Sequence, residues 1–197
     1  MNELILEFLN RLDALLLPFA TQGERFDMYH LGRSALIMHY GLRLATKDID
    51  IVGTGNSRLE NKALELLGKN TDIANLLGVY LDVVAQAIPP VPRWFRERCR
   101  PVAGNWQVVR LWQLEVHDLA TTKLKSFRHH DKQDLQALCD KGLLEVGKLR
   151  ESLDAAFPWR SPKEGDGDND PDTPDWGTAL TNFKRVEKYL NGELRSL

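Results

Sequence analysis

Two acids stand two residues apart in the apolar stretch TKDIDIV, residues 46–52. Alternate residues of a β-strand face the same side, so Asp48 and Asp50 project together while Ile49 and Ile51 project to the other face. Neighbouring carboxylates repel each other and are costly to bury unless a positive charge neutralises them. A divalent Mg²⁺ or Mn²⁺ ion, which prefers hard oxygen ligands, would supply that charge.

A third acid, Asp82, lies in another apolar stretch, VYLDVV, residues 79–84. If this strand pairs beside residues 46–52, three carboxylates converge. Such a triad suits nucleotidyl transfer, because metal ions there neutralise a triphosphate and activate the attacking hydroxyl. Taken alone, however, each acid is more often explained as part of a solvated strand edge.

The segment YHLGRSALIMHYG, residues 29–41, adds a second feature upstream of the acids. It places Gly32 and Ser34 where a strand is expected to turn into a helix. Such a turn offers backbone N–H groups and the start of a helix to a phosphate. This turn followed by two acids on a strand is more specific than either part alone.

At this point the chain resembles a known family. LGRSALIMHYGLRLATKDIDIV, residues 31–52, is similar to the nucleotidyltransferase superfamily pattern, in which a Gly-Gly/Ser turn precedes an Asp-x-Asp strand. YLDVV followed by PPVP, and VHDLATTKLKSFRHHDKQDLQAL at residues 116–138, resemble the later blocks of one bacterial branch. That branch is similar to the abortive-infection and toxin–antitoxin nucleotidyltransferases. The resemblance covers roughly residues 28–145.

The resemblance implies a role for each matching residue. Gly32 and Ser34 would hold the triphosphate, and Asp48 and Asp50 would bind the metal. Asp82 would be the third metal-binding acid, and it would orient the acceptor hydroxyl or serve as its base. Lys123 would reach a phosphate, and Asp131 or Asp134 would brace Lys123 or bind the acceptor.

One residue departs from the family pattern. Arg33 follows Gly32, where a second small residue is usual. A side chain of this size would crowd the nucleotide, or its guanidinium would bind a phosphate. The departure puts activity in doubt more than fold.

The function implied is a metal-dependent nucleotidyltransferase using Mg²⁺ or Mn²⁺. It would transfer a nucleoside monophosphate from an NTP to RNA or protein, as a component of a toxin–antitoxin or abortive-infection system with a cognate antitoxin or partner protein. One alternative is a catalytically degenerate module that binds RNA or a protein partner. Another is an RNA-binding scaffold that uses RWFRERCR, residues 93–100, because arginines and aromatics alternate there.

The hydrophobic pattern predicts an α+β fold: a small mixed β-sheet of the nucleotidyltransferase type, with flanking helices and a helical C-terminal part. Strands are expected at 26–31, 47–53 and 78–86, with one long strand or a strand pair at 102–116. Helices are expected at 2–20, 34–41, 57–68, 118–127, 134–142, 143–157 and 176–194.

This pattern also predicts how the chain is organised. Residues 1–115 would form the α/β core, 116–160 a helical segment packed on it, 161–175 a flexible acidic linker, and 176–197 a C-terminal amphipathic helix. The net charge of −2 gives no general argument for nucleic-acid binding, and two separated cysteines make a zinc site improbable. Without a signal peptide or a long apolar run, we expect a soluble cytoplasmic protein that does not enter a membrane.

Overall fold

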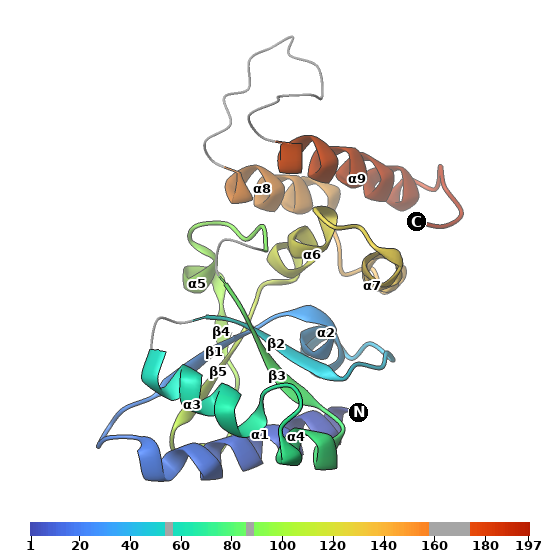
Figure 1. Cartoon of the computed structure of the whole chain (residues 1–197). Helices are drawn as coiled ribbons and strands as arrows, with labels where there is room; N and C mark the ends of the chain where they lie inside the picture. The colour runs from blue at the N-terminus through green and yellow to red at the C-terminus, as the bar shows by residue number, and fades with distance from the viewer. Residues whose placement is uncertain (54–56, 86–88, 158–173) are drawn as a thin grey trace. The chain divides into compact units, whose positions relative to one another are not determined.

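The structure, a computed structural model, describes residues 1–53, 57–85, 89–157 and 174–197 (Figure 1). It divides into two compact units. The first consists of Met1–Ile88 and Cys99–Leu114, and the second of Pro89–Arg98 and Glu115–Leu197. The residues expected to form an acidic linker lie mostly in 158–173, outside the described residues. In the described part of the chain, no helix combines the length and apolar character needed to cross a membrane.

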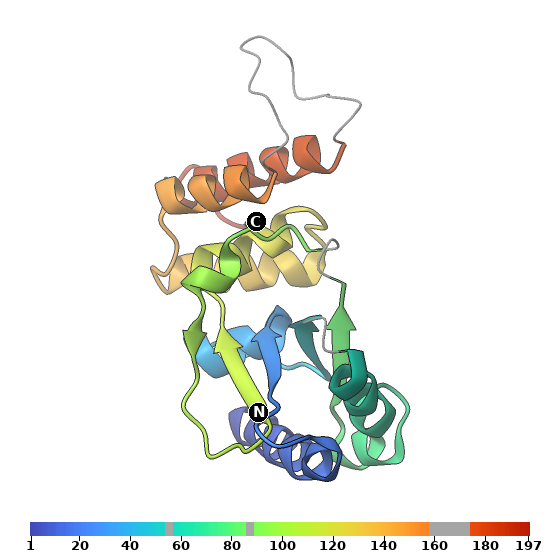
Figure 2. The ribbon, with the colours of Figure 1, turned by 90° about the vertical axis from the view of Figure 1, so that its left-hand side faces the viewer.

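The first unit contains a five-stranded mixed sheet, which confirms the predicted α+β class. Its strands are β1 (Phe26–His30), β2 (Asp48–Val52), β3 (Tyr80–Val84), β4 (Arg100–Pro101) and β5 (Val109–Gln113). The spatial order is β3-β2-β1-β5-β4, which Figure 2 shows with β4 at the left edge and β3 at the right. β1 is antiparallel to β2 and parallel to β5, and β2 is parallel to β3.

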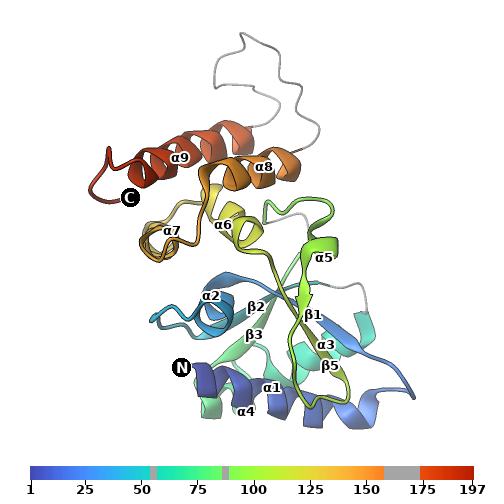
Figure 3. The same cartoon turned by 180° about the vertical axis from the view of Figure 1, so that it is seen from behind.

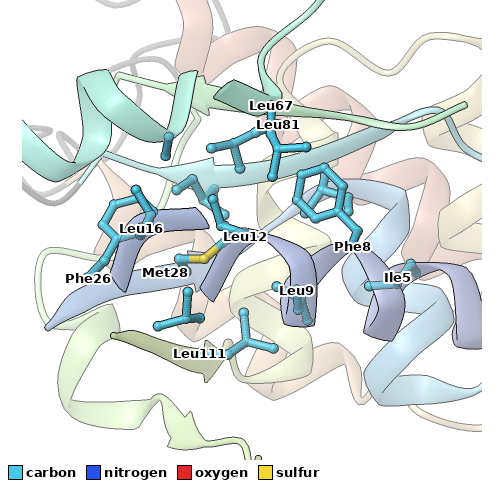
Figure 4. Close-up of a cluster of buried hydrophobic side chains, with 14 of the residues drawn as sticks. Ile5, Phe8, Leu9, Leu12, Leu16, Phe26, Met28, Leu67, Leu81 and Leu111 are labelled. Atoms are coloured by element: carbon cyan, nitrogen blue, oxygen red, sulfur yellow. The ribbon is translucent and has the colours of Figure 1, made fainter. Parts of the chain in front are cut away.

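Helices α1 (Asn2–Leu16) and α3 (Ser57–Leu67) cover one face of this sheet. α1 has apolar residues at helical spacing, so its buried side chains form one stripe (Figure 4): Ile5, Phe8, Leu9, Leu12 and Leu16. They pack on alternate strand residues, among them Phe26, Met28, Leu81 and Leu111. Because strand side chains alternate, Asp48 and Asp50 are directed to the face away from this core.

Three further elements complete the first unit. α2 (Gly32–Tyr40) begins directly after β1 and ends at Gly41, whose φ of 63° is the left-handed conformation common at helix ends. α4 (Asp72–Leu77) was not predicted, whereas the 3-10 turn η1 (Leu17–Phe19) lies within the helix expected at 2–20, whose α-helical part ends at Leu16. Neither possibility left open for residues 102–116 is right in full: that range contains only β5, and the antiparallel partner of β5 is β4, which lies just before the range at Arg100–Pro101.

The second unit is helical. It contains the short helix α5 (Phe95–Arg98), then α6 (Val116–Leu124), α7 (His129–Asp140), α8 (Val146–Ala156) and α9 (Pro174–Leu190). Figure 3 shows α8 and α9 side by side. Their buried apolar side chains include Leu149, Leu153 and Phe183. A helix was expected at 176–194, and the structure begins it two residues earlier.

A buried acid on α1 ties the N-terminal helix to the start of β5. The carboxylate of Asp13 accepts hydrogen bonds from the backbone N–H groups of Gln107, Val108 and Val109, at 2.9, 2.7 and 2.8 Å. Val109 is the first residue of β5 and the other two donors precede it. The N–H groups of the buried Val108 and Val109 would otherwise lack a partner away from water. Asp13 interrupts the apolar pattern of α1, yet its side chain is 8% exposed.

We expect Asp13→Ala to lower the free energy of unfolding by about 3 kcal/mol, because buried donors lose a charged acceptor. Chemical denaturation of the full chain measures this. The control is Glu7→Ala, an exposed acid on the same helix, which should change stability by less than about 0.5 kcal/mol. Equal small effects from both variants would contradict the structural role of Asp13.

Candidate functional site

Three predicted site acids lie on the same face of two neighbouring strands. β2 and β3 pair in parallel so that Asp50 is opposite Asp82 and Asp48 is opposite Tyr80. Opposite residues in a ladder share a face, so the three carboxylates and the Tyr80 ring form one acidic surface. The pKa of Tyr80 is raised, first by burial and then by the negative charges of the three acids. Asp82 is exposed, and Asp48 and Asp50 are half-buried.

Gly32, the first residue of α2, lies directly against Asp50. A Cβ built on Gly32 would be 1.8 Å from Asp50 Oδ2, a distance at which no real side chain fits. The φ of Gly32 is +66°, which also favours glycine. The bare backbone therefore lets a carboxylate approach the positive end of a helix dipole. It is the same helix start that the family resemblance assigns to phosphate.

Ser34 is buried and its hydroxyl is turned into the first unit. It forms a 2.9 Å hydrogen bond with His30 Nε2, and its hydroxyl lies 3.4 Å from the Leu31 carbonyl oxygen, to which it can donate. His30 Nδ1 in turn lies 2.9 Å from His39 Nε2. The resemblance assigned Ser34 to the triphosphate, but here its side chain holds α2 to the end of β1. At this turn, the backbone N–H groups at the start of α2 are the remaining candidates to donate a hydrogen bond to a phosphate.

The two histidines are held neutral by their surroundings. Burial, and secondarily the neighbouring His39, hold the pKa of His30 well below its usual value. Burial lowers the pKa of His39 to about 4. A chain of hydrogen bonds between two imidazoles and a hydroxyl is satisfied with both rings neutral, because each neutral ring has one donor and one acceptor.

The three aspartates offer the type of ligand atom that a divalent cation binds. Carboxylate oxygens are the ligands that Mg²⁺ and Mn²⁺ prefer. Asp50 and Asp82 are opposite each other in the ladder, and Asp48 lies two residues before Asp50 on the same face. Among the described residues, however, no three such side chains are gathered closely enough to hold an ion. The Asp48 carboxylate accepts a hydrogen bond from Thr46, and that of Asp50 rests on Gly32.

The remaining predicted residues divide between the units. Arg33 is the second residue of α2 and is half-buried. Lys123 lies at the end of α6 in the second unit and is 8% exposed. Its ammonium is 2.9 Å from Asp134 Oδ2 and 3.7 Å from Asp131 Oδ1. Both acids that the resemblance offered as partners of Lys123 therefore contact it, whereas Lys125 pairs with a different carboxylate.

Sequence reasoning missed an aromatic pair on the same sheet face as the acids. Tyr29 of β1 is in register with Trp112 of β5, and their rings are stacked with centroids 6.0 Å apart at 14°. Asp27 and Arg110 form a register pair two residues earlier on the same face. They are joined by two hydrogen bonds, one of them 2.8 Å from Arg110 Nη2 to Asp27 Oδ2. The alternation in FDMYH, which buries Phe26, Met28 and His30, was the sequence feature that could have shown that Tyr29 projects to the opposite face.

Inside the second unit, one arginine of the segment at 93–100 is held by an ion pair. Arg98 forms an ion pair with Asp118, whose carboxylate also accepts a 2.6 Å hydrogen bond from Ser152. Burial raises the pKa of Asp118, while Ser152 and Arg98 oppose that rise. Phe95 is fully buried and Trp94 is 44% exposed. Arg98 therefore serves the packing of the second unit, and sequence reasoning did not identify Asp118 as its partner.

We expect Gly32→Ala to destabilise the chain more than Gly23→Ala. Both glycines have positive φ, so both substitutions cost about 1 kcal/mol or more in backbone strain. Only Gly32 also has a neighbour in the way, since a Cβ on Gly23 meets nothing within 4 Å. The extra loss from overpacking should be about 1–3 kcal/mol. Equal losses in denaturation experiments would show that the Asp50 contact is unimportant.

We expect stability to fall as the pH is lowered from 7 to 5, because the unfolded chain protonates its histidines near pH 6.5 whereas folded His39 resists until about pH 4. From His39 alone the loss is about 2 kcal/mol over this range. The free energy of unfolding, measured at both pH values, should fall less in His39→Gln. The exposed His129→Gln is the control and should keep the full pH dependence.

Comparison with known proteins identifies the family. Residues 7–160 match the model of the family described as nucleotidyltransferase of unknown function (DUF6036). No curated protein and no solved structure matches the chain. The match spans the whole acidic face, the Gly32 turn and the Lys123 cluster. The chain therefore belongs to the DUF6036 family of nucleotidyltransferases.

Proposed function

We propose that this chain is a metal-dependent nucleotidyltransferase that moves a nucleoside monophosphate from an NTP to a hydroxyl on RNA or protein and releases pyrophosphate. The observation that carries the proposal is the register of β2 and β3. It sets Asp48, Asp50 and Asp82 on one face, with Asp50 in contact with Gly32 at the start of α2. The carboxylates provide oxygen ligands for a cation, and the helix start beside them provides backbone N–H groups for the phosphate that the cation binds.

Asp48 and Asp50 are the proposed ligands of Mg²⁺ or Mn²⁺, with Asp82 as the third. When bound, such an ion would neutralise the triphosphate. Asp82 is the most exposed of the three, which supports its proposed role of accepting a hydrogen bond from an incoming hydroxyl and orienting it or accepting its proton. The backbone at Gly32 would bind a phosphate. The contact with Asp50 supports this, because it shows that an oxygen atom can come close to the backbone of Gly32.

Arg33 and Ser34 enter the proposal in different ways. The Ser34 hydroxyl is used by His30, so Ser34 contributes through its backbone and through the position of α2. Arg33 follows the glycine in the first turn of the helix, where its long side chain would give a guanidinium to a phosphate. A neutral His30 beneath this turn adds no positive charge that would compete for the carboxylates.

The proposal extends to the second unit and to the biological setting. Lys123, braced by Asp134 and Asp131, is assigned to a phosphate by the sequence resemblance, and that assignment stays a prediction. The setting that the resemblance implies is a toxin–antitoxin or abortive-infection system, with a partner protein that restrains the enzyme. Neither part is needed for the central test.

We expect the parent chain to bind an NTP in the presence of Mg²⁺ and the double variant Asp48→Asn, Asp50→Asn to bind it at least about tenfold more weakly. The loss of one charged interaction, worth about 1.5–3 kcal/mol, is sufficient for that change. Isothermal titration with each of the four NTPs, with Mg²⁺ and with EDTA, measures it. The matched control, Asp72→Asn, removes an exposed acid of α4 in the same unit.

A double variant that binds NTP and Mg²⁺ as the parent does would overturn the metal assignment. A parent that binds no NTP under any condition would favour the alternative of a non-catalytic module. If the parent does bind an NTP, transfer of label from an α-labelled NTP to RNA or to protein separates the two acceptor classes. Thermal unfolding of the double variant checks that its fold is retained.

A further inference from the structure

The polar face of the sheet is divided by charge. On β2 and β3 it carries the acids Asp48, Asp50 and Asp82. On β1 and β5 it carries the stacked rings of Tyr29 and Trp112. The ladder register shows that both halves belong to one face, because Tyr29 is opposite Val52 and Val52 is two residues beyond Asp50.

The aromatic half is electrically neutral. Asp27 and Arg110 lie opposite each other and their charges cancel in a two-bond pair. Asp27 also accepts a 2.6 Å hydrogen bond from Trp112 Nε1, and the Arg110 guanidinium lies 5.3 Å from the centre of the Trp112 ring. These contacts fix the orientation of the indole, which is half-buried, while 51% of the Arg110 side chain is exposed. The result is a rigid aromatic surface with no net charge.

We propose that Tyr29 and Trp112 form the binding site for the base of the NTP, an inference that rests on the proposed function. Aromatic rings bind nucleobases by stacking and accept any base. A base is neutral, so it suits the neutral half of the face, while the phosphates and their cation belong to the acidic half. The aromatic row is displaced from the Asp50–Asp82 row by two residues, or about 7 Å along the strands.

Charge also decides against single-stranded RNA as the occupant of this pair. An RNA segment would carry several phosphates across the face, where three carboxylates would repel them and where Arg110, the cation of the aromatic half, is paired with Asp27. RNA binding to a sheet needs a positive surplus that tracks the backbone. A single nucleotide whose phosphates share a divalent cation avoids this repulsion.

The test compares ATP with inorganic triphosphate, which has no base, in titrations of the full chain with Mg²⁺. We expect Trp112→Leu to weaken ATP binding about tenfold and to leave triphosphate binding unchanged. Trp112→Phe keeps a ring and should retain most of the ATP affinity. In the parent, ATP and GTP should bind more tightly than CTP and UTP, because purines stack over a larger area, and Trp112→Leu should reduce that difference.

The control is Trp94→Leu, an exposed tryptophan of the second unit, which should not change ATP binding. If Trp112→Leu fails to fold, Tyr29→Leu tests the same surface. ATP binding that is equal in the parent and both Leu variants, or triphosphate binding that falls with ATP binding, overturns the base site alone. A parent that binds neither ligand overturns the proposed function as well. Binding of an oligoribonucleotide that depends on Trp112 while ATP binding does not would reassign the pair to RNA.

Discussion

The close approach of the Asp50 carboxylate to the backbone of Gly32 is the contact on which the geometry of the candidate site depends. A side chain at position 32 is excluded both by this distance and by the positive φ of that residue. Glycine allows the helix to begin directly after β1, so that its positive end meets an acid on β2. The buried hydrogen-bond chain through His30 and Ser34 then holds the same helix from the inside.

Charged side chains elsewhere in the structure differ in the partners that neutralise them. On the sheet, Asp82 lies opposite Asp50 in the ladder and Tyr80 lies opposite Asp48, whereas Asp27 lies opposite Arg110 and is hydrogen-bonded to it. In the second unit, Lys123 contacts two carboxylates and Asp118 is satisfied by Arg98 and Ser152. Buried charges are tolerated when they are paired and hydrogen-bonded. The three carboxylates gathered on β2 and β3 are therefore the arrangement that a bound divalent cation would stabilise.

Much of the fold could be predicted because periodicity is a local property. The alternation in DIDIV and the helical spacing in α1 both follow from which side chains must be buried. Short elements carry too few repeats to be recognised, which is why α4 and the two-residue β4 were missed or misplaced. Asp13 shows another limit of prediction from sequence. An acid in an amphipathic helix is expected to face water, and its burial is explained only by the distant backbone N–H groups that it binds in the folded chain.

The sequence by itself determined the family, the side of each strand on which an acid projects, and the need for a small residue at the turn before α2. Strand neighbours and side-chain partners were decided only by the tertiary structure, because they join segments far apart in the chain. Pairing of β2 with β3 set Asp82 opposite Asp50, and pairing of β1 with β5 set Trp112 opposite Tyr29. The hydroxyl of Ser34 was likewise turned inward by a buried histidine that no local pattern associates with it.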